Sequence, residues 1–291
     1  MSDFHGEATR VLENQFIQLE YLANSARIVR FSPKGKANLF ADLEKKPVQT
    51  PYGSFYFRGG HRLWHAPEAM PRTYIPDNEG ALVSDIPGGV RVEMPAEAWT
   101  HIAKSIAIQL NPDQPQVIIH HELRNEGPWA VEFSPWALTM FRLGGVAIFP
   151  QPVGNTDEAG LLSNRQLVVW PYTRLGEPRL HLRDDFILVH ATPSLPPIKF
   201  GYFNPHGWMG YWLDGVLFVK RFDVQTGVSY PDHGCNAESY CNDQFIELET
   251  LGPLTKLEPG EFVSHTETWE VHTELRSDLI PPEIQKIIAA L

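Results

Sequence analysis

Alternation of apolar and polar residues, repeated in short segments, is the feature of this sequence that most restricts its fold. A repeat of two places successive side chains on opposite faces of a β-strand, whereas a helix requires a repeat of about 3.6 residues. The alternating or strand-like segments are residues 17–21, 90–94, 106–110, 117–123 and 216–220. Turn sequences fall at 33–35, 87–89, 125–127, 214–215 and 259–260. This pattern predicts an all-β chain of many short antiparallel strands.

Helical periodicity is confined to the C-terminal end of the sequence. Pro281 and Pro282 precede a helical pattern over 283–288, and proline suits the first turn of a helix. The chain has 291 residues, a length that β-sandwiches reach as one unit, and no low-complexity linker or tandem repeat divides it. We therefore expect residues 1–291 to form a single domain, a large antiparallel β-sandwich with a short C-terminal helix.

Charge and composition narrow the class of partner. Lys and Arg total 24 against 35 Asp and Glu, a net charge of −11, which disfavours nucleic-acid binding. No apolar run approaches about 18 residues, and the N-terminus lacks the features of a signal peptide. We therefore expect no membrane span and a cytoplasmic protein. Cys235 and Cys241 are too few for a disulfide framework, and free thiols are favoured over a local bridge.

Four segments are unusually rich in aromatic and charged residues for plain strands. They are residues 57–68, residues 133–140, residues 169–174, and residues 230–238 taken with 247–253. Aromatic faces suit the apolar C–H faces of a sugar, and charged or bidentate groups suit its hydroxyls. No glycine-rich phosphate loop and no Gly-x-Ser-x-Gly motif occurs. If the four segments converge in space, they predict a sugar pocket. Any one of their tryptophans could instead be an ordinary residue of the hydrophobic core.

Several titratable residues have two interpretations. Glu247 and Glu249 share one strand face, so they are either solvated surface acids or, in a concavity, close carboxylates that raise the pKa of one of them. Lys199 and Lys220 stand among apolar neighbours, where a strand lysine more often pairs inward with an acid. One histidine of the His120-His121 pair must point inward, and a hydrogen-bonded core histidine is the favoured interpretation.

A metal site is the main alternative for the first segment. His61, His65 and Glu68 are ligand types that a metal could use. A histidine pair spaced by four residues requires a helix, however, and the glycines at 59–60 and Pro67 favour a loop. We predict no metal ligands and no cofactor.

The sequence also resembles a known superfamily. Its opening (12–20, 26–31 and Gly35-x2-Asn38-Leu39) and its closing stretches (248–250 and 257–261) are similar to galactose-mutarotase-like domains. It more closely resembles one branch of them, a domain of unknown function, in GGHRLWHAPE (59–68), PWALTMF (135–141), GGVAIFPQP (144–152), VVWPYTRL (168–175), ELETLGPL (247–254) and HTETWEV (265–271). The resemblance implies a β-supersandwich with a sugar-sized cleft on its concave face.

The resemblance also implies roles for individual residues. In aldose 1-epimerases a glutamate takes the proton of the anomeric hydroxyl and a histidine protonates the ring oxygen; by motif, Glu249 matches the glutamate. Trp136 stands in the place of the histidine, and an indole cannot act as the acid, so His61 or His65 becomes the candidate. The predicted substrate-binding residues are Arg62, Trp64, His65, Trp136, Trp170, Lys199, Glu238 and Glu247.

Three functions follow from these observations. The leading one is binding of a small sugar or sugar acid, with acid–base chemistry like that of an aldose 1-epimerase. The second is sugar binding without catalysis. The third is a lyase or isomerase acting on a uronic acid, with Arg62 and Lys199 holding the carboxylate.

Overall fold

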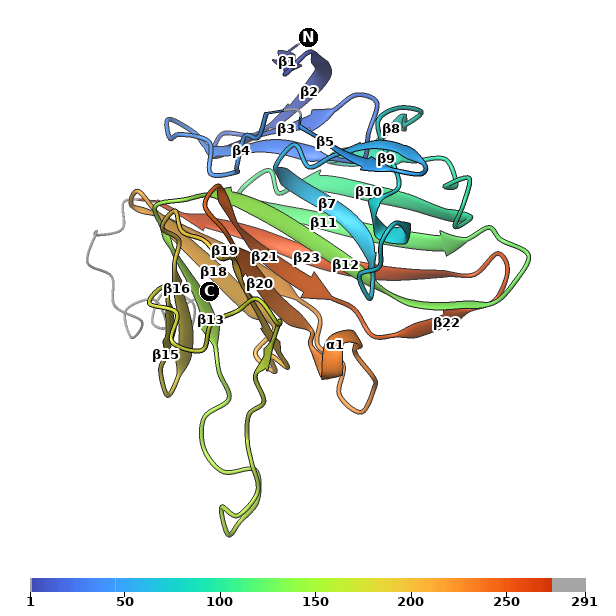
Figure 1. Cartoon of the computed structure of the whole chain (residues 1–291). Coiled ribbons are helices and arrows are strands. Elements are labelled where there is room, and N and C mark those ends of the chain that lie inside the picture. The colour runs from blue at the N-terminus through green and yellow to red at the C-terminus, as the bar shows by residue number, and fades with distance from the viewer. Residues whose placement is uncertain (1, 45, 274–291) are drawn as a thin grey trace.

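The computed structural model describes residues 2–44 and 46–273, nearly half of which belong to two large antiparallel β-sheets (Figure 1). The first sheet contains, in spatial order, β1 (Ser2–Phe4), β2 (Glu7–Glu13), β3 (Ile17–Leu22), β4 (Ile28–Pro33), β7 (Gly60–Ala66), β12 (Val131–Arg142), β21 (Phe245–Leu251), β20 (Ala237–Cys241), β17 (Ile198–Tyr202) and β14 (Val168–Val169), with β22 (Thr255–Leu257) paired to β12. The second contains β15 (Leu180–Leu182), β16 (Phe186–His190), β13 (Val146–Pro150), β18 (Trp208–Leu213), β19 (Val216–Phe222), β23 (Phe262–His272), β11 (Gln116–Asn125), β10 (Ile102–Leu110), β9 (Gly89–Glu93) and β8 (Leu82–Ile86).

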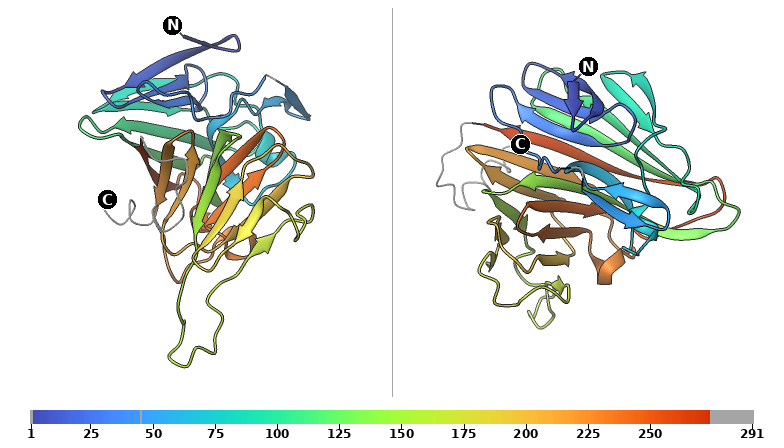
Figure 2. Two further views of the ribbon diagram at one scale, coloured as in Figure 1. Left: turned by 90° about the vertical axis from the view of Figure 1, so that its left-hand side faces the viewer. Right: turned by 45° about the horizontal axis from the view of Figure 1, so that its top comes forward.

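Smaller elements connect the sheets. A separate hairpin consists of β5 (Pro47–Thr50) and β6 (Gly53–Tyr56), and the helical elements in the described part of the chain are η1 (Arg72–Tyr74) and the four-residue α1 (Pro231–Gly234). The connection between β13 and β14 extends away from the sheets as a long loop (Figures 1 and 2). The helix expected after Pro282 lies outside the described residues.

The predicted all-β class is confirmed, since the strand-like segments of the sequence form β3, β9, β10, β11 and β19. No helix in residues 2–44 or 46–273 is long and apolar enough to span a membrane. Cys235 and Cys241 are buried free thiols.

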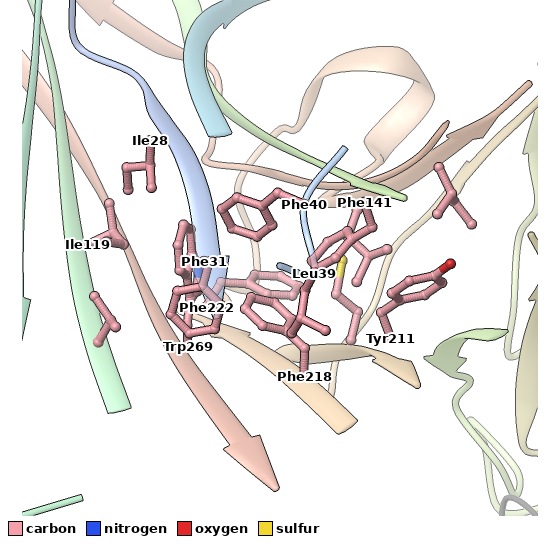
Figure 3. Close-up of a cluster of buried hydrophobic side chains, with 14 of the residues drawn as sticks. Ile28, Phe31, Leu39, Phe40, Ile119, Phe141, Tyr211, Phe218, Phe222 and Trp269 are labelled. Carbon is pink, nitrogen blue, oxygen red and sulfur yellow. The ribbon is translucent and has the colours of Figure 1, made fainter. Parts of the chain in front are cut away.

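The two sheets pack face to face around an aromatic core (Figure 3). Phe31 of the first sheet meets Phe218 and Trp269 of the second edge-on, with ring centroids 5.7 Å apart in both pairs. Phe40 and Phe141 continue this cluster. Burying one such ring contributes about 1.5–3 kcal/mol. The inward-facing side chains of the first sheet therefore hold it against the second, and the alternate side chains point to its outer face.

Candidate functional site

Strand pairing brings the unusual segments together on the outer face of the first sheet. The strands β7, β12, β21, β20 and β17 are hydrogen-bonded neighbours. Across them Arg62 is opposite Leu138, Leu138 is opposite Glu249, and Glu249 is opposite Glu238. In the next row Glu247 is opposite Tyr240, which is opposite Lys199. Because directly opposite residues share a face, these side chains converge although they are far apart in the sequence.

A cavity of about 480 Å³, which we call the main cavity, lies over these rows. Its aromatic lining consists of Phe57, Trp64, Tyr74, Trp136, Tyr172, Tyr240 and Phe245. Its charged lining consists of Glu44, Lys46, Arg62, Glu68, Lys199 and Glu247. The volume falls within the usual range for small-molecule sites.

Lys199 lines the main cavity and is held by two buried carboxylates that do not line it. Lys199 Nζ lies 3.0 Å from Glu238 Oε2 and 3.0 Å from Glu249 Oε2, and both acids are fully buried. The ammonium group also lies over the rings of Trp136 and Trp170, 4.6 and 4.8 Å from their centroids. Burial opposes the charge of Lys199, but attraction to the two acids outweighs it and raises its pKa. Burial, together with the nearby charge of Glu249, raises the pKa of Glu238 well above its ordinary value.

A second ion pair lies beside the first and reaches the cavity surface. Arg62 Nη2 donates to Glu247 Oε1 at 2.9 Å, and the guanidinium carbon lies 4.1 Å from the ring centroid of Trp64. Arg62 Nε and Nη1 are buried without a hydrogen-bond partner among the described residues. Burial and the neighbouring charge of Glu249 raise the pKa of Glu247 to about 7, because together they outweigh the lowering effect of the Arg62 charge. Glu247 is therefore a cavity-lining carboxyl that titrates near neutral pH.

Glu249, the residue matched by motif to a catalytic base, is covered by two neighbours. Its Oε2 accepts hydrogen bonds from Lys199 Nζ at 3.0 Å and from Trp136 Nε1 at 2.9 Å. Glu249 does not line the main cavity, whereas Lys199 and Trp136 do. The indole that stands in the place of a histidine thus acts as a hydrogen-bond donor to this carboxylate.

His61 and His65 lie on the opposite face of β7 from Arg62 and Trp64. His61 is buried between the sheets, where its Nδ1 pairs with Thr139 Oγ1 and its Nε2 with His121 Nε2, both at 2.8 Å. His121 Nδ1 lies 2.8 Å from the carbonyl oxygen of His265, which fixes the proton on that nitrogen. The expectation that one histidine of the pair at 120–121 is a bonded core residue therefore agrees with the structure. Neither His61 nor His65 lines the main cavity.

The sequence-based metal set does not come together, because His61 lies between the sheets, His65 lines a different hollow and Glu68 lines the main cavity. His61 does lie near His121 and Glu267, with ligand atoms within 4.8 Å of one another. Lys220 Nζ, however, lies 3.0 Å from Glu267 Oε1, and Trp269 Nε1 donates a hydrogen bond to Glu267 Oε2 at 2.8 Å. Hydrogen bonds and an ion pair therefore account for this cluster without a metal.

No protein-family model and no curated protein matches the sequence. Solved protein structures, however, match this chain in fold. A galactose mutarotase-like protein from Lactobacillus casei superimposes with a TM-score of 0.61 at 12% identity, covering 91% of this chain and 100% of its own. An Escherichia coli K12 protein provisionally assigned as an aldose 1-epimerase gives 0.57 at 14% identity, covering 92% and 100%. This chain has the galactose mutarotase-like fold. A TPR-domain-containing protein from Parabacteroides distasonis gives 0.63 at 13% identity; the match covers 94% of this chain but spans about half (49%) of that longer one.

Within this galactose mutarotase-like fold, the structure adds residues that sequence reasoning missed. Tyr74, Tyr240 and residues 43–44 and 46–48 line the main cavity. Tyr240 follows Glu238 by two residues, so the period-two pattern of β20 could have placed both on one face. Tyr74, at the end of η1, and residues 43–44 and 46–48 carry no such signal, because they lie outside the strands of the two large sheets.

Proposed function

We propose that the main cavity binds a neutral sugar of about monosaccharide size. The observation that carries this proposal is the meeting of the aromatic walls Trp64 and Trp136 with the paired polar groups Arg62 and Glu247 in one hollow. Indole faces pack against the C–H faces of a sugar ring, and a guanidinium–carboxylate pair offers donors and acceptors to neighbouring hydroxyls.

The ion pairs made by Lys199 and Arg62 at the main cavity favour a neutral sugar over a uronic acid. A uronate site needs a cation with no internal counter-charge. Lys199 lies between Glu238 and Glu249, and Arg62 is bonded to Glu247. Since each of these cations already has a carboxylate partner, an added carboxylate would have to displace an existing partner.

Glu247 supports a second candidate function, acid–base catalysis on the bound sugar. Its pKa of about 7 makes both protonation states available at neutral pH. In an epimerase-like reaction Glu247 would accept the proton of the anomeric hydroxyl while the ring oxygen gains a proton from solvent, so that the ring opens and can reclose on either face. A positioned acid–base group is worth about 10²–10⁴-fold in rate.

A thermal-shift screen of neutral sugars, uronic acids and sugar phosphates tests the binding proposal. A ligand at 100 times its dissociation constant stabilises the folded state by about 2.7 kcal/mol. We expect a neutral sugar to raise the melting temperature, and Tyr172→Ala to weaken this effect because Tyr172 lines the cavity. Leu175→Ala is the matched control, since Leu175 lies in the same loop, is 86% exposed and does not line the cavity.

Stabilisation by uronic acids alone, or by no sugar at all, would contradict the proposal. Polarimetry of a bound aldose separates the two candidate functions. Acceleration of mutarotation that is lost in Glu247→Gln supports catalysis, and a rate equal to that of buffer leaves sugar binding as the function.

A further inference from the structure

An exposed aromatic pair stands on the other side of the segment 67–74 from the main cavity. Trp99, in the loop between β9 and β10, is 64% exposed and stacks on Tyr52 of the β5–β6 turn. Their ring centroids are 4.9 Å apart with an interplanar angle of 30°. Stacking on Tyr52 from a different loop holds the Trp99 ring in place while leaving much of it open to solvent. A large apolar ring fixed in this way has the form of a binding platform.

The Trp99–Tyr52 pair borders a hollow of about 600 Å³, which we call the Trp99 hollow. His65, Arg72, Thr100 and Glu132 supply its polar lining. None of the residues that line the Trp99 hollow also lines the main cavity. The segment 67–74 separates the two, with Pro67 and Arg72 toward the hollow and Glu68 and Tyr74 toward the main cavity.

His65 lines the Trp99 hollow as a buried, neutral imidazole. Arg72 Nη1 lies 2.6 Å from His65 Nδ1, and because arginine only donates, Nδ1 accepts and the proton resides on Nε2. Burial lowers the pKa of His65 to about 4, which keeps the ring neutral. The Nε2 atom is buried and lies 3.6 Å from Glu97 Oε2, and Glu97 does not line the Trp99 hollow.

The charges around the Trp99 hollow indicate a neutral ligand. Arg72 and Glu132 are its charged lining residues other than the neutral His65, one of each sign. A flat aromatic ring and balanced charges match a hydroxylated ring better than an anion or a cation.

We propose that the Trp99 hollow is a second carbohydrate site that binds one neutral sugar unit of a glycan. The sugar ring packs on the exposed face of Trp99, and its hydroxyl groups face the polar lining residues Arg72 and Glu132. This site is independent of sugar binding in the main cavity, because the two share no lining residue.

Native gel electrophoresis through gels containing neutral soluble polysaccharides tests the proposal. The probes are a β-glucan, an α-glucan, a galactomannan and a xylan. We expect at least one to retard the protein, and Trp99→Ala to weaken the affinity about tenfold. Trp129→Ala is the matched control, since Trp129 is 78% exposed and lines neither cavity, and it should migrate like the parent protein. Circular dichroism of each variant checks that the fold is retained.

Tyr172→Ala distinguishes this proposal from the function of the main cavity. If the Trp99 hollow binds glycans, Tyr172→Ala keeps the retardation even when it loses the response to small sugars. No retardation by any polysaccharide, equal loss in Trp99→Ala and Trp129→Ala, or Trp99-dependent binding of a proline-rich peptide in place of polysaccharide would each overturn the proposal.

Discussion

Replacing Lys199 with methionine tests whether the buried cluster under the main cavity has been described correctly. Lys199 is 4% exposed and is the cation that lies within 3.0 Å of both Glu238 and Glu249, which are fully buried. Methionine keeps most of the side-chain volume and removes the charge. Removing one partner of a buried ion pair costs about 3–5 kcal/mol, because it leaves an uncompensated buried charge. We expect Lys199→Met to lower the free energy of unfolding at pH 7 by this amount.

The pH dependence of this loss follows from the carboxyl groups. Without Lys199, burial and the charge of Glu249 raise the folded-state pKa of Glu238 further above the unfolded value of about 4.3. A carboxyl whose folded-state pKa is raised binds more protons folded than unfolded, so its destabilising effect grows as pH rises above 4.3. The loss should therefore be small at pH 4 and full at pH 7.

Urea unfolding followed by tryptophan fluorescence at pH 4 and pH 7 measures both quantities. The double variant Lys199→Met/Glu249→Gln should recover more than half of the loss at pH 7, because glutamine removes the stranded charge and can still accept from Trp136 Nε1. A Lys199→Met protein within about 1 kcal/mol of the parent at pH 7, or a loss that does not change with pH, would refute this reasoning.

Two further variants test the other titratable groups. Calorimetry should show that Glu247→Gln abolishes any change in sugar affinity between pH 6 and 8, since the pKa of Glu247 is about 7. If the variant kept the pH dependence of the parent, that dependence would belong to another group. His265→Asn should be destabilised at pH 7.5, where His265 Nε2 pairs with Thr250 Oγ1 at 2.7 Å. Burial lowers the pKa of His265 to about 4, so the parent protein loses stability from this position as pH falls from 6.5 to 4, and the variant does not. The difference in the free energy of unfolding between the two proteins should therefore shrink by about 3 kcal/mol over this range. A difference that stays constant would show that His265 is not held neutral.

Much of the fold follows from local alternation in the sequence. The period of two identified five of the strands, and it correctly placed Glu247 and Glu249 on one face. The apolar neighbours of Lys199 and Lys220 indicated that each lysine pairs with a buried acid. The structure shows such a pair for both lysines. The particular partners could not be predicted, because β17, β19, β20, β21 and β23 meet through long-range pairing that no local pattern specifies.

The segment 57–68 shows where sequence reasoning went wrong. Its glycines and Pro67 indicated a loop, which allowed His61, Arg62 and His65 to share one site. Residues 60–66 instead form β7, and Gly60 makes this possible because it has φ +64° and a Cβ there would lie 2.0 Å from the carbonyl oxygen of Ile28. Strand geometry then sends His61 and His65 to the face opposite Arg62, so the expected grouping of the three was wrong.

The central claim is that the main cavity receives a sugar, and a crystal structure of the protein soaked with the best neutral sugar from the thermal-shift screen tests it most directly. The account predicts a sugar ring against Trp64 or Trp136, with a hydroxyl within hydrogen-bond distance of Arg62 or Glu247. A sugar bound elsewhere while this cavity holds only water would contradict it.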